Sequence, residues 1–487
     1  MRTRTFLLGA ALALSAAAND TSAASLQRLD GSTVPAEQLE GSVAAIMEKA
    51  GVPGLSVAII NDSRVAYVHG FGVKNKETGE PVDDETIFAA ASFSKTVFAY
   101  LVMLLAEDGV IDLDEPLYEY LDKPLPDYPR YADLKGDERY KKITARIVLS
   151  HMTGFPNWRF LTPDEKLVIR WTPGERFGYS GEGIDLLQMV VEEVTGKGLE
   201  ELARERVFDP LGMNRTSYVW QDRFEPNLAV PHDRYERPRR FNKRREADAA
   251  GSMDTTAGDY AKLLVALLNA DGGRRVTVDE MRRRQIVIRS PRAFGPRANE
   301  DSGGPEGLSW SVGWGRIDGE YGRAYFHTGH EGGTQNYNVT FVDKGIGVVF
   351  LSNSDNFEGV ARELAEVTIG DTYSPFDWLG YPYYDPAQSR EPPPEPVAID
   401  LPANILQRYV GSYRLSVGTT LYVKMEGGGL LASSDQVDWA PLLAETETRF
   451  FVEGQDVAIQ FLLDGSDRVE GLILETEGVE LRAERNE

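Results

Sequence analysis

The chain of 487 residues contains no cysteine. It can therefore form no disulfide, cannot be anchored to lipid through a cysteine and has no thiol nucleophile. Histidine is also scarce, because the five histidines are scattered without the spacing of zinc ligands. The sequence therefore argues against thiol chemistry and against a zinc site.

The chain also has few basic residues relative to acidic ones, and few long apolar runs. With 52 lysines and arginines against 76 aspartates and glutamates, the net charge is −24, which argues against nucleic-acid partners and anionic membranes. Beyond the N-terminus no run is long and apolar enough for a stable membrane span. Two basic islands, at 239–245 and 282–284, are interpreted as solvated surface. The alternative is that they steer an anionic substrate, if they flank a cleft.

The N-terminus has the composition of an export signal. Arg2 and Arg4 precede an apolar segment at 6–18, and small residues follow that would suit a signal peptidase. We therefore predict a signal peptide over residues 1–24 and a periplasmic or secreted location.

The remainder divides into two folded parts and a linker. Residues 373–400 are rich in proline, which is typical of a stiff extended linker, and residues 401–487 alternate like the short strands of a small all-β barrel or sandwich. Residues 25–372 mix helices and strands. We expect strands at 55–60, 64–68, 309–317, 338–343 and 347–352. Strand blocks at both ends with helices between them predict an α+β domain, in which helices flank an antiparallel sheet.

The segment at 89–108 is central to the functional interpretation. Its apolar residues favour a buried helix, and Ser92 and Lys95 are three residues apart near its start, so they share one helix face. Burial would lower the pKa of Lys95 from about 10.4 and let it accept the Ser92 proton. By itself the pattern also fits a helix cap followed by a solvated lysine.

Two further segments could complete a hydrolase site. Tyr179, in the Gly-flanked loop 177–181, is a candidate proton acceptor if a lysine lowers its pKa from about 10. The segment 326–333 places glycines after His327, and the N–H of His330 could bind a developing oxyanion. Each segment alone also fits an ordinary packed aromatic residue or a glycine-rich turn, but their combination points to nucleophilic catalysis.

Together these motifs resemble the class C β-lactamases and their relatives, the penicillin-binding DD-peptidases, D-stereospecific aminopeptidases and esterases. Ser92-Phe-Ser-Lys95, Tyr179-Ser-Gly181 and His327-Thr-Gly329 stand in the order of the three family motifs. The similarity covers residues 35–370 and extends to the stretches at 149–156, 210–213 and 250–256. It implies a β-lactamase/transpeptidase-like fold with a helical subdomain, and the C-terminal module resembles the small β-barrel domains often appended in this family.

The resemblance also implies roles for individual residues. Ser92 would be the acylated nucleophile, Lys95 would assist its deprotonation, and Tyr179 would pass the proton to the leaving group. The N–H groups of Ser92 and His330 would form the oxyanion hole. His327, Thr328, Gly329 and Gly181 occupy the substrate-binding positions of the family motifs. No metal or organic cofactor is implied.

Two departures from the family pattern bear on the substrate. Gly181 replaces the usual asparagine, which removes a side-chain amide that would hold an acylamide. His327 replaces lysine, and at an ordinary pKa of about 6.5 it would be charged about a quarter of the time at pH 7. Both changes disfavour an efficient β-lactamase. His330-Glu-Gly332 is a competing register for the third motif, but His327 keeps the family's residue types in place.

The sequence therefore predicts an exported serine hydrolase that cleaves an ester or amide through an acyl-enzyme on Ser92. Its substrate would be a small molecule or peptide, including D-amino acid or cell-wall-derived compounds. The alternatives are β-lactamase or DD-carboxypeptidase activity, and a non-catalytic cell-wall-binding member of the family. His151, in a Gly/Pro turn, is interpreted as structural.

Overall fold

A computed structural model describes residues 25–486. It leaves out 163, 270–274, 389–390, 393–395, 416–419, 435, 437–438, 454, 456 and 477–478 within that range. The predicted signal peptide at residues 1–24 lies outside the described residues. None of the helices that the structure describes combines the length and apolar character needed to cross a membrane.

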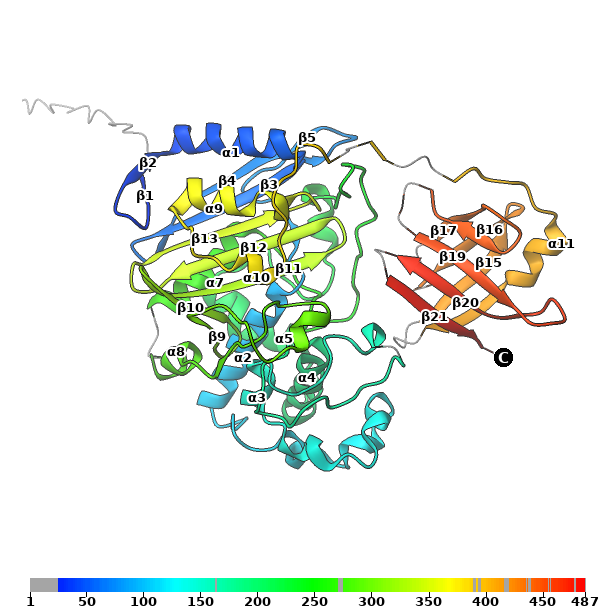
Figure 1. Ribbon diagram of the computed structural model, residues 1–487, viewed down its shortest axis with the longest axis horizontal. Coiled ribbons are helices and arrows are strands. Elements are labelled where there is room, and N and C mark those ends of the chain that lie inside the picture. The colour runs from blue at the N-terminus through cyan, green and yellow to red at the C-terminus, as the bar shows by residue number, and fades with distance from the viewer. Residues whose placement is uncertain are drawn as a thin grey trace, which may run out of the picture.

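The larger part of the molecule is built on an antiparallel sheet, in which the described residues form nine strands in the order β5-β4-β3-β13-β12-β11-β10-β9-β8 (Figure 1). Their bounds are β3 Gly54–Asn61, β4 Arg64–Asn75, β5 Glu80–Pro81, β8 Ile286–Val287, β9 Leu308–Trp310, β10 Gly315–Gly319, β11 Gly322–Glu331, β12 Thr334–Phe341 and β13 Ile346–Ser352. Strand β3 pairs with β13, so the N- and C-terminal segments of this domain meet in mid-sheet, as predicted.

Two strand predictions differ from the structure in detail. Strand β12 begins at Thr334 rather than at 338, because Gly332 and Gly333 make a two-residue hairpin turn directly after β11. The predicted strand at 309–317 is divided into β9 and β10. Strand β12 is therefore longer at its start than predicted, whereas a turn interrupts the predicted strand at 309–317.

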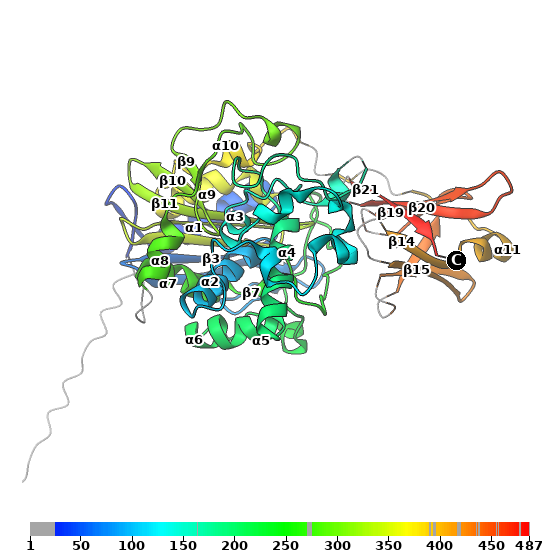
Figure 2. The same cartoon turned by 90° about the horizontal axis from the view of Figure 1, so that it is seen from below.

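Helices cover both faces of the sheet (Figures 1 and 2). Helices α1 (Ala36–Ala50) and α9 (Ala361–Ile369) pack together on one face, and α2 (Phe93–Glu107) and α7 (Ala257–Asn269) lie on the other. The other α-helices are α3 Ala145–Leu149, α4 Gly181–Thr195, α5 Leu199–Ala203, α6 Asp209–Leu211, α8 Arg275–Arg282, α10 Phe376–Leu379 and α11 Ala403–Leu406. The predicted α+β architecture is confirmed.

The C-terminal module is a closed barrel with a core of its own. Its strands are β14 Gly411–Leu415, β15 Thr420–Glu426, β16 Gly429–Ser433, β17 Ala440–Ala444, β18 Arg449–Phe451, β19 Val457–Leu463, β20 Val469–Thr476 and β21 Val479–Arg485. The barrel forms a separate lobe beside the larger domain (Figure 2). The first part of the proline-rich segment 373–400 is not extended, because α10 buries Phe376 and Trp378 against the sheet domain.

Candidate active site

Ser92 stands at the N-terminus of α2, directly after a strained residue. Ala91 has φ 46°, a left-handed conformation that costs a non-glycine residue roughly 1–2 kcal/mol. Helix α2 is buried from Phe93 to Leu105, so the strain is held by packing on every side. The Ser92 hydroxyl makes no capping bond to the helix and is available for chemistry.

Lys95 lies against that hydroxyl, as the helical spacing predicted. Its Nζ is 3.0 Å from the Ser92 Oγ, and it also donates to the carbonyl of Ala250. Burial lowers the pKa of Lys95 to about 8, although the carboxyl groups of Asp248 and Asp185 oppose this shift. At pH 8 about half of the molecules therefore hold a neutral lysine that can accept the Ser92 proton.

Tyr179 is half-buried on the other side of Lys95, with its hydroxyl oxygen enclosed. The lysine Nζ lies over the ring face, 5.2 Å from its centroid. Burial raises the pKa of Tyr179 above 10, and the nearby Ser92 hydroxyl offsets only part of that rise. The expectation that a lysine lowers this pKa is therefore wrong, because desolvation of the phenolate dominates. Within the described structure the Tyr179 hydroxyl has no hydrogen-bond partner, so its proton remains available for donation.

The third motif lies on β11, and its register is decided by Gly329. A Cβ at that position would lie 2.6 Å from the carbonyl oxygen of Ala90, two residues before Ser92. Only glycine allows β11 to approach the start of α2 so closely. This close approach favours His327-Thr-Gly329 over His330-Glu-Gly332.

The backbone of His330 has the direction that an oxyanion hole requires. Glu331 and Thr334 flank a two-residue turn and must exchange hydrogen bonds, so the next pair, His330 and Gln335, does not. The His330 N–H therefore points away from β12, toward the edge that faces α2. Its imidazole is 57% exposed and lies 3.3 Å from Glu358.

His327 is buried and uncharged. Burial, helped by the nearby Lys95, lowers its pKa to about 3. The predicted partial charge at pH 7 is therefore wrong, because the cation cannot be solvated there. The Nδ1 donates to the carbonyl of Thr328 at 2.7 Å, which leaves Nε2 as a bare acceptor with no partner in the described structure. Thr328 itself shares a 2.6 Å hydrogen bond with Tyr381.

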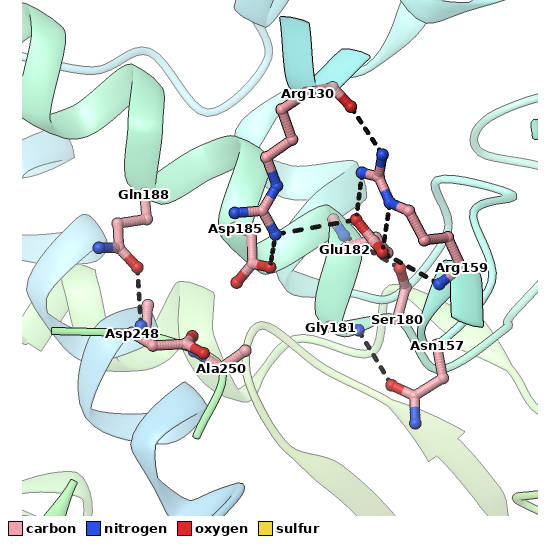
Figure 3. Close-up of polar contacts among 12 residues, drawn as sticks. Arg130, Asn157, Arg159, Ser180, Gly181, Glu182, Asp185, Gln188, Asp248 and Ala250 are labelled. Atoms are coloured by element: carbon pink, nitrogen blue, oxygen red, sulfur yellow. Dashed lines mark hydrogen bonds and ion pairs between the residues drawn. The ribbon is translucent and has the colours of Figure 1, made fainter. Parts of the chain in front are cut away.

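Trp158 and Asn157 occupy the region where the family asparagine is missing. A Cβ at Gly181 would lie 2.4 Å from the Trp158 ring, so the indole fills that space. The Asn157 Oδ1 accepts the Gly181 N–H at 3.1 Å, as Figure 3 shows. Since a backbone N–H can only donate, this bond orients the amide with its Nδ2 away from Gly181.

His151 supports Tyr179 rather than merely making a turn. It has φ 53°, its ring centroid lies 4.2 Å from that of Tyr179, and its Nδ1 accepts the Ser180 N–H at 3.2 Å. Burial and Lys95 hold its pKa well below 6.5, so it is neutral. The prediction that His151 is only a structural turn residue did not include this contact. Its segment, 149–156, is one of the stretches that resemble the family.

The nucleophile opens into a cavity of about 620 Å³. Besides Ser92 and Tyr179, its lining includes Asn157, Trp158, Phe160, Arg244, Asp248, Phe294, Thr328, His330, Glu331, Glu358, Leu379 and Tyr381. The aromatic side chains make much of this wall apolar. Its basic side chains have acidic neighbours, because Arg244 lies 2.5 Å from Glu331 and His330 lies 3.3 Å from Glu358.

The basic island at 239–245 is not simply solvated surface. Arg244 is enclosed in the catalytic cavity. Arg239, Arg240 and Lys243 line a neighbouring cavity of about 440 Å³, whose other wall includes Val457 of the barrel. This island does flank the cleft, which is the condition for the alternative interpretation. Steering of an anionic substrate stays a prediction.

Comparison with known proteins identifies the family of the larger domain. The family described as Beta-lactamase matches residues 39–369, and a domain of unknown function, DUF3471, matches residues 395–485. The penicillin-binding protein 4* of Bacillus subtilis (strain 168) is 25% identical over 452 residues, which cover 86% of this chain and 92% of that protein. The D-aminopeptidase of Gluconobacter oxydans is 25% identical over 200 residues, which cover 40% of this chain and 38% of that protein.

Two solved structures share the fold. An octameric penicillin-binding protein homologue from Pyrococcus abyssi has a TM-score of 0.57 at 22% identity, covering 92% of this chain and 99% of its own. The D-alanine carboxypeptidase AmpC from Burkholderia cenocepacia has a TM-score of 0.55 at 20% identity, covering 68% and 97%. The β-lactamase/transpeptidase-like fold is therefore confirmed.

Proposed function

Because the chain belongs to the Beta-lactamase family, we propose that it cleaves an ester or amide through an acyl-enzyme on Ser92. The observation that carries the proposal is the buried Lys95, whose Nζ lies 3.0 Å from the Ser92 Oγ and whose pKa is lowered to about 8. A lysine in this state is a base matched to neutral and mildly alkaline pH.

Acylation follows from the positions of these groups. Neutral Lys95 takes the hydroxyl proton as the Ser92 Oγ attacks the substrate carbonyl. The N–H groups of Ser92 and His330 bind the resulting oxyanion, and loss of one such donor typically costs about 2.7–4 kcal/mol. Tyr179, held as a phenol, gives its proton to the departing oxygen or nitrogen and regains one from the Lys95 ammonium.

Deacylation repeats the sequence with water as the nucleophile. Neutral Lys95 removes a proton from the water, directly or through Tyr179, as the water attacks the ester carbonyl. The same two N–H groups bind the second oxyanion. The Ser92 oxygen then leaves, takes a proton from the Lys95 ammonium and restores the free enzyme.

The charges around the cavity favour a substrate without a carboxylate near the reacting carbonyl. His327 is neutral, and Arg244 and His330 are paired with Glu331 and Glu358. A penicillin or a peptide C-terminus would find no unpaired cation among these groups. Esterase or peptidase activity, including cleavage of D-amino acid peptides, is therefore preferred to β-lactamase or DD-carboxypeptidase activity. A periplasmic or secreted location, from the predicted signal peptide, is part of the proposal.

Asn157 would contribute to substrate choice, because its Nδ2 can donate to an amide carbonyl on the acyl side. We expect Asn157→Ala to reduce kcat/KM for an N-acetylated amino acid p-nitrophenyl ester about 5- to 20-fold, since a lost neutral hydrogen bond costs about 1–2 kcal/mol. The control substrate is p-nitrophenyl acetate, which has no such amide and should lose less than twofold. Equal losses on both esters would contradict this role for Asn157.

A fluorophosphonate probe tests the proposed chemistry directly. The wild-type protein should be labelled on Ser92, and Ser92→Ala should not be labelled, with equal thermal unfolding of the two proteins as the control for folding. The non-catalytic alternative predicts no labelling of either protein. A panel of p-nitrophenyl esters, D-amino acid amides and a chromogenic cephalosporin then identifies the substrate class. Cephalosporin turnover near the diffusion limit would reverse the preference stated above.

A further inference from the structure

Lys95 contacts the short loop at 248–250 as well as Ser92. Its Nζ donates to the Ala250 carbonyl, and the Ala250 N–H donates to the Asp248 carboxylate at 2.6 Å. Asp248 therefore holds the N–H of the same residue whose carbonyl accepts from the lysine. The loop is anchored to α4, because the Gln188 side chain accepts the Ala249 N–H at 2.7 Å (Figure 3).

A second carboxyl group lies against Asp248. The side chain of Asp185, on α4, is 8% exposed and interacts with the Asp248 carboxyl group. Burial and the Asp248 charge raise the pKa of Asp185 well above its ordinary value, although Arg130 forms an ion pair with it. Asp185 therefore holds its proton more tightly than an ordinary aspartate does. Of the two carboxyl groups, Asp248 has the larger effect on Lys95.

The other groups around Lys95 carry no charge at neutral pH. His151 and His327 are neutral, and Tyr179 is a phenol. Trp158 offers only its ring, 5.7 Å from the Nζ. Asp248 and Asp185 are the groups that favour the charged lysine, and the effect of Asp248 is the larger.

We propose that Asp248 is a positioning residue for Lys95: it holds the amine through Ala250 and supplies most of the negative charge beside it. This inference rests on the proposed function. It makes the carboxyl pair the element that sets the pH above which Ser92 becomes nucleophilic.

The test is the rate of fluorophosphonate labelling as a function of pH, which needs no knowledge of the substrate. The wild-type rate should rise with pH to a plateau, with a midpoint near 8 where Lys95 loses its proton. In Asp248→Asn the lysine loses its anionic neighbour, so we expect the midpoint to fall by about one pH unit. In the double variant with Asp185→Asn the midpoint should fall at least as far, because both carboxyl groups near Lys95 are then removed.

Two control variants separate charge from structure. Asp185→Asn removes the smaller of the two carboxyl effects, so its midpoint should fall less than half as far as that of Asp248→Asn. Asp248→Glu keeps the charge and should keep the midpoint, even if its rate falls or if Asp248→Asn does not fold. Three results would overturn the inference. The midpoint could be unchanged in folded Asp248→Asn, it could shift as far in Asp185→Asn as in Asp248→Asn, or it could fall by a full unit in Asp248→Glu. Failure of the wild type to label at Ser92 would instead overturn the proposed function.

Discussion

At the scale of single residues, burial removes the charge from two basic groups with different consequences. Lys95 becomes a base near pH 8, which suits the activation of Ser92. His327, in the same apolar surroundings, becomes a neutral acceptor at all but strongly acidic pH. The position that carries a cation in the family motif therefore carries none here, and this single change excludes electrostatic capture of a carboxylate at this position.

His327 should make the protein sensitive to acid. Its pKa is about 3 when folded and about 6.5 when unfolded, so the unfolded chain binds more protons between these values and stability falls as pH drops through them. Between pH 7.5 and 4.5 the loss should reach about 2–3 kcal/mol. In His327→Gln the free energy of unfolding should fall by about 2–3 kcal/mol less than in the wild type over this pH range, as measured by urea unfolding of the catalytic domain. The difference in unfolding free energy between the two proteins at pH 7.5 gives the cost of the substitution itself. If that difference were the same at pH 4.5, the prediction would be contradicted.

At the scale of elements, the site exists where three segments meet. Helix α2 supplies the nucleophile and the lysine, the loop before α4 supplies Tyr179, and β11 closes the third side. The distance between β11 and the start of α2 is set by a glycine rather than by a hydrogen bond between side chains. The catalytic geometry therefore depends on how closely the two backbones approach.

Gly329→Ala tests that dependence. The added Cβ would meet the Ala90 carbonyl at 2.6 Å, so β11 must move away from Ser92 and take the His330 N–H with it. A displacement of about 1 Å can cost 100-fold in rate, and we expect a loss of that order in kcat/KM for a p-nitrophenyl ester. Gly198→Ala is the matched control, because nothing lies within 4 Å of its Cβ position. Activity within threefold of the wild type in Gly329→Ala would show that β11 does not set the geometry.

At the scale of the whole molecule, the chain contains two folded parts. The sheet domain and its helices match the Beta-lactamase family, and the closed barrel has a hydrophobic core of its own. The barrel is nevertheless close to the catalytic cleft, because the neighbouring cavity is lined by Arg239 and Glu331 on one side and by Val457 and Leu474 on the other. Glu331 lines both cavities, so the C-terminal lobe borders the approach to the active site.

Much of this arrangement could be predicted because it depends on local order along the chain. The three-residue spacing of Ser92 and Lys95 brings them together in any helix, and the alternation of β-branched residues marked the pairs of strands at both ends of the sheet domain. Three barrel strands, β14, β16 and β17, carry a weaker pattern of this kind, because they are short and their sequences include glycine, alanine and proline.

The sequence by itself determined the nucleophile, its lysine, the family and the order of the motifs, since these depend on residue type and spacing. Only the tertiary structure decided the charge states and the register of the third motif. Desolvation of Tyr179 and His327 comes from residues distant in sequence, and Gly329 is recognised only by its contact with Ala90. Asp248 acts on Lys95 through Ala250, which lies 155 positions beyond the lysine. No local pattern encodes a contact over that separation.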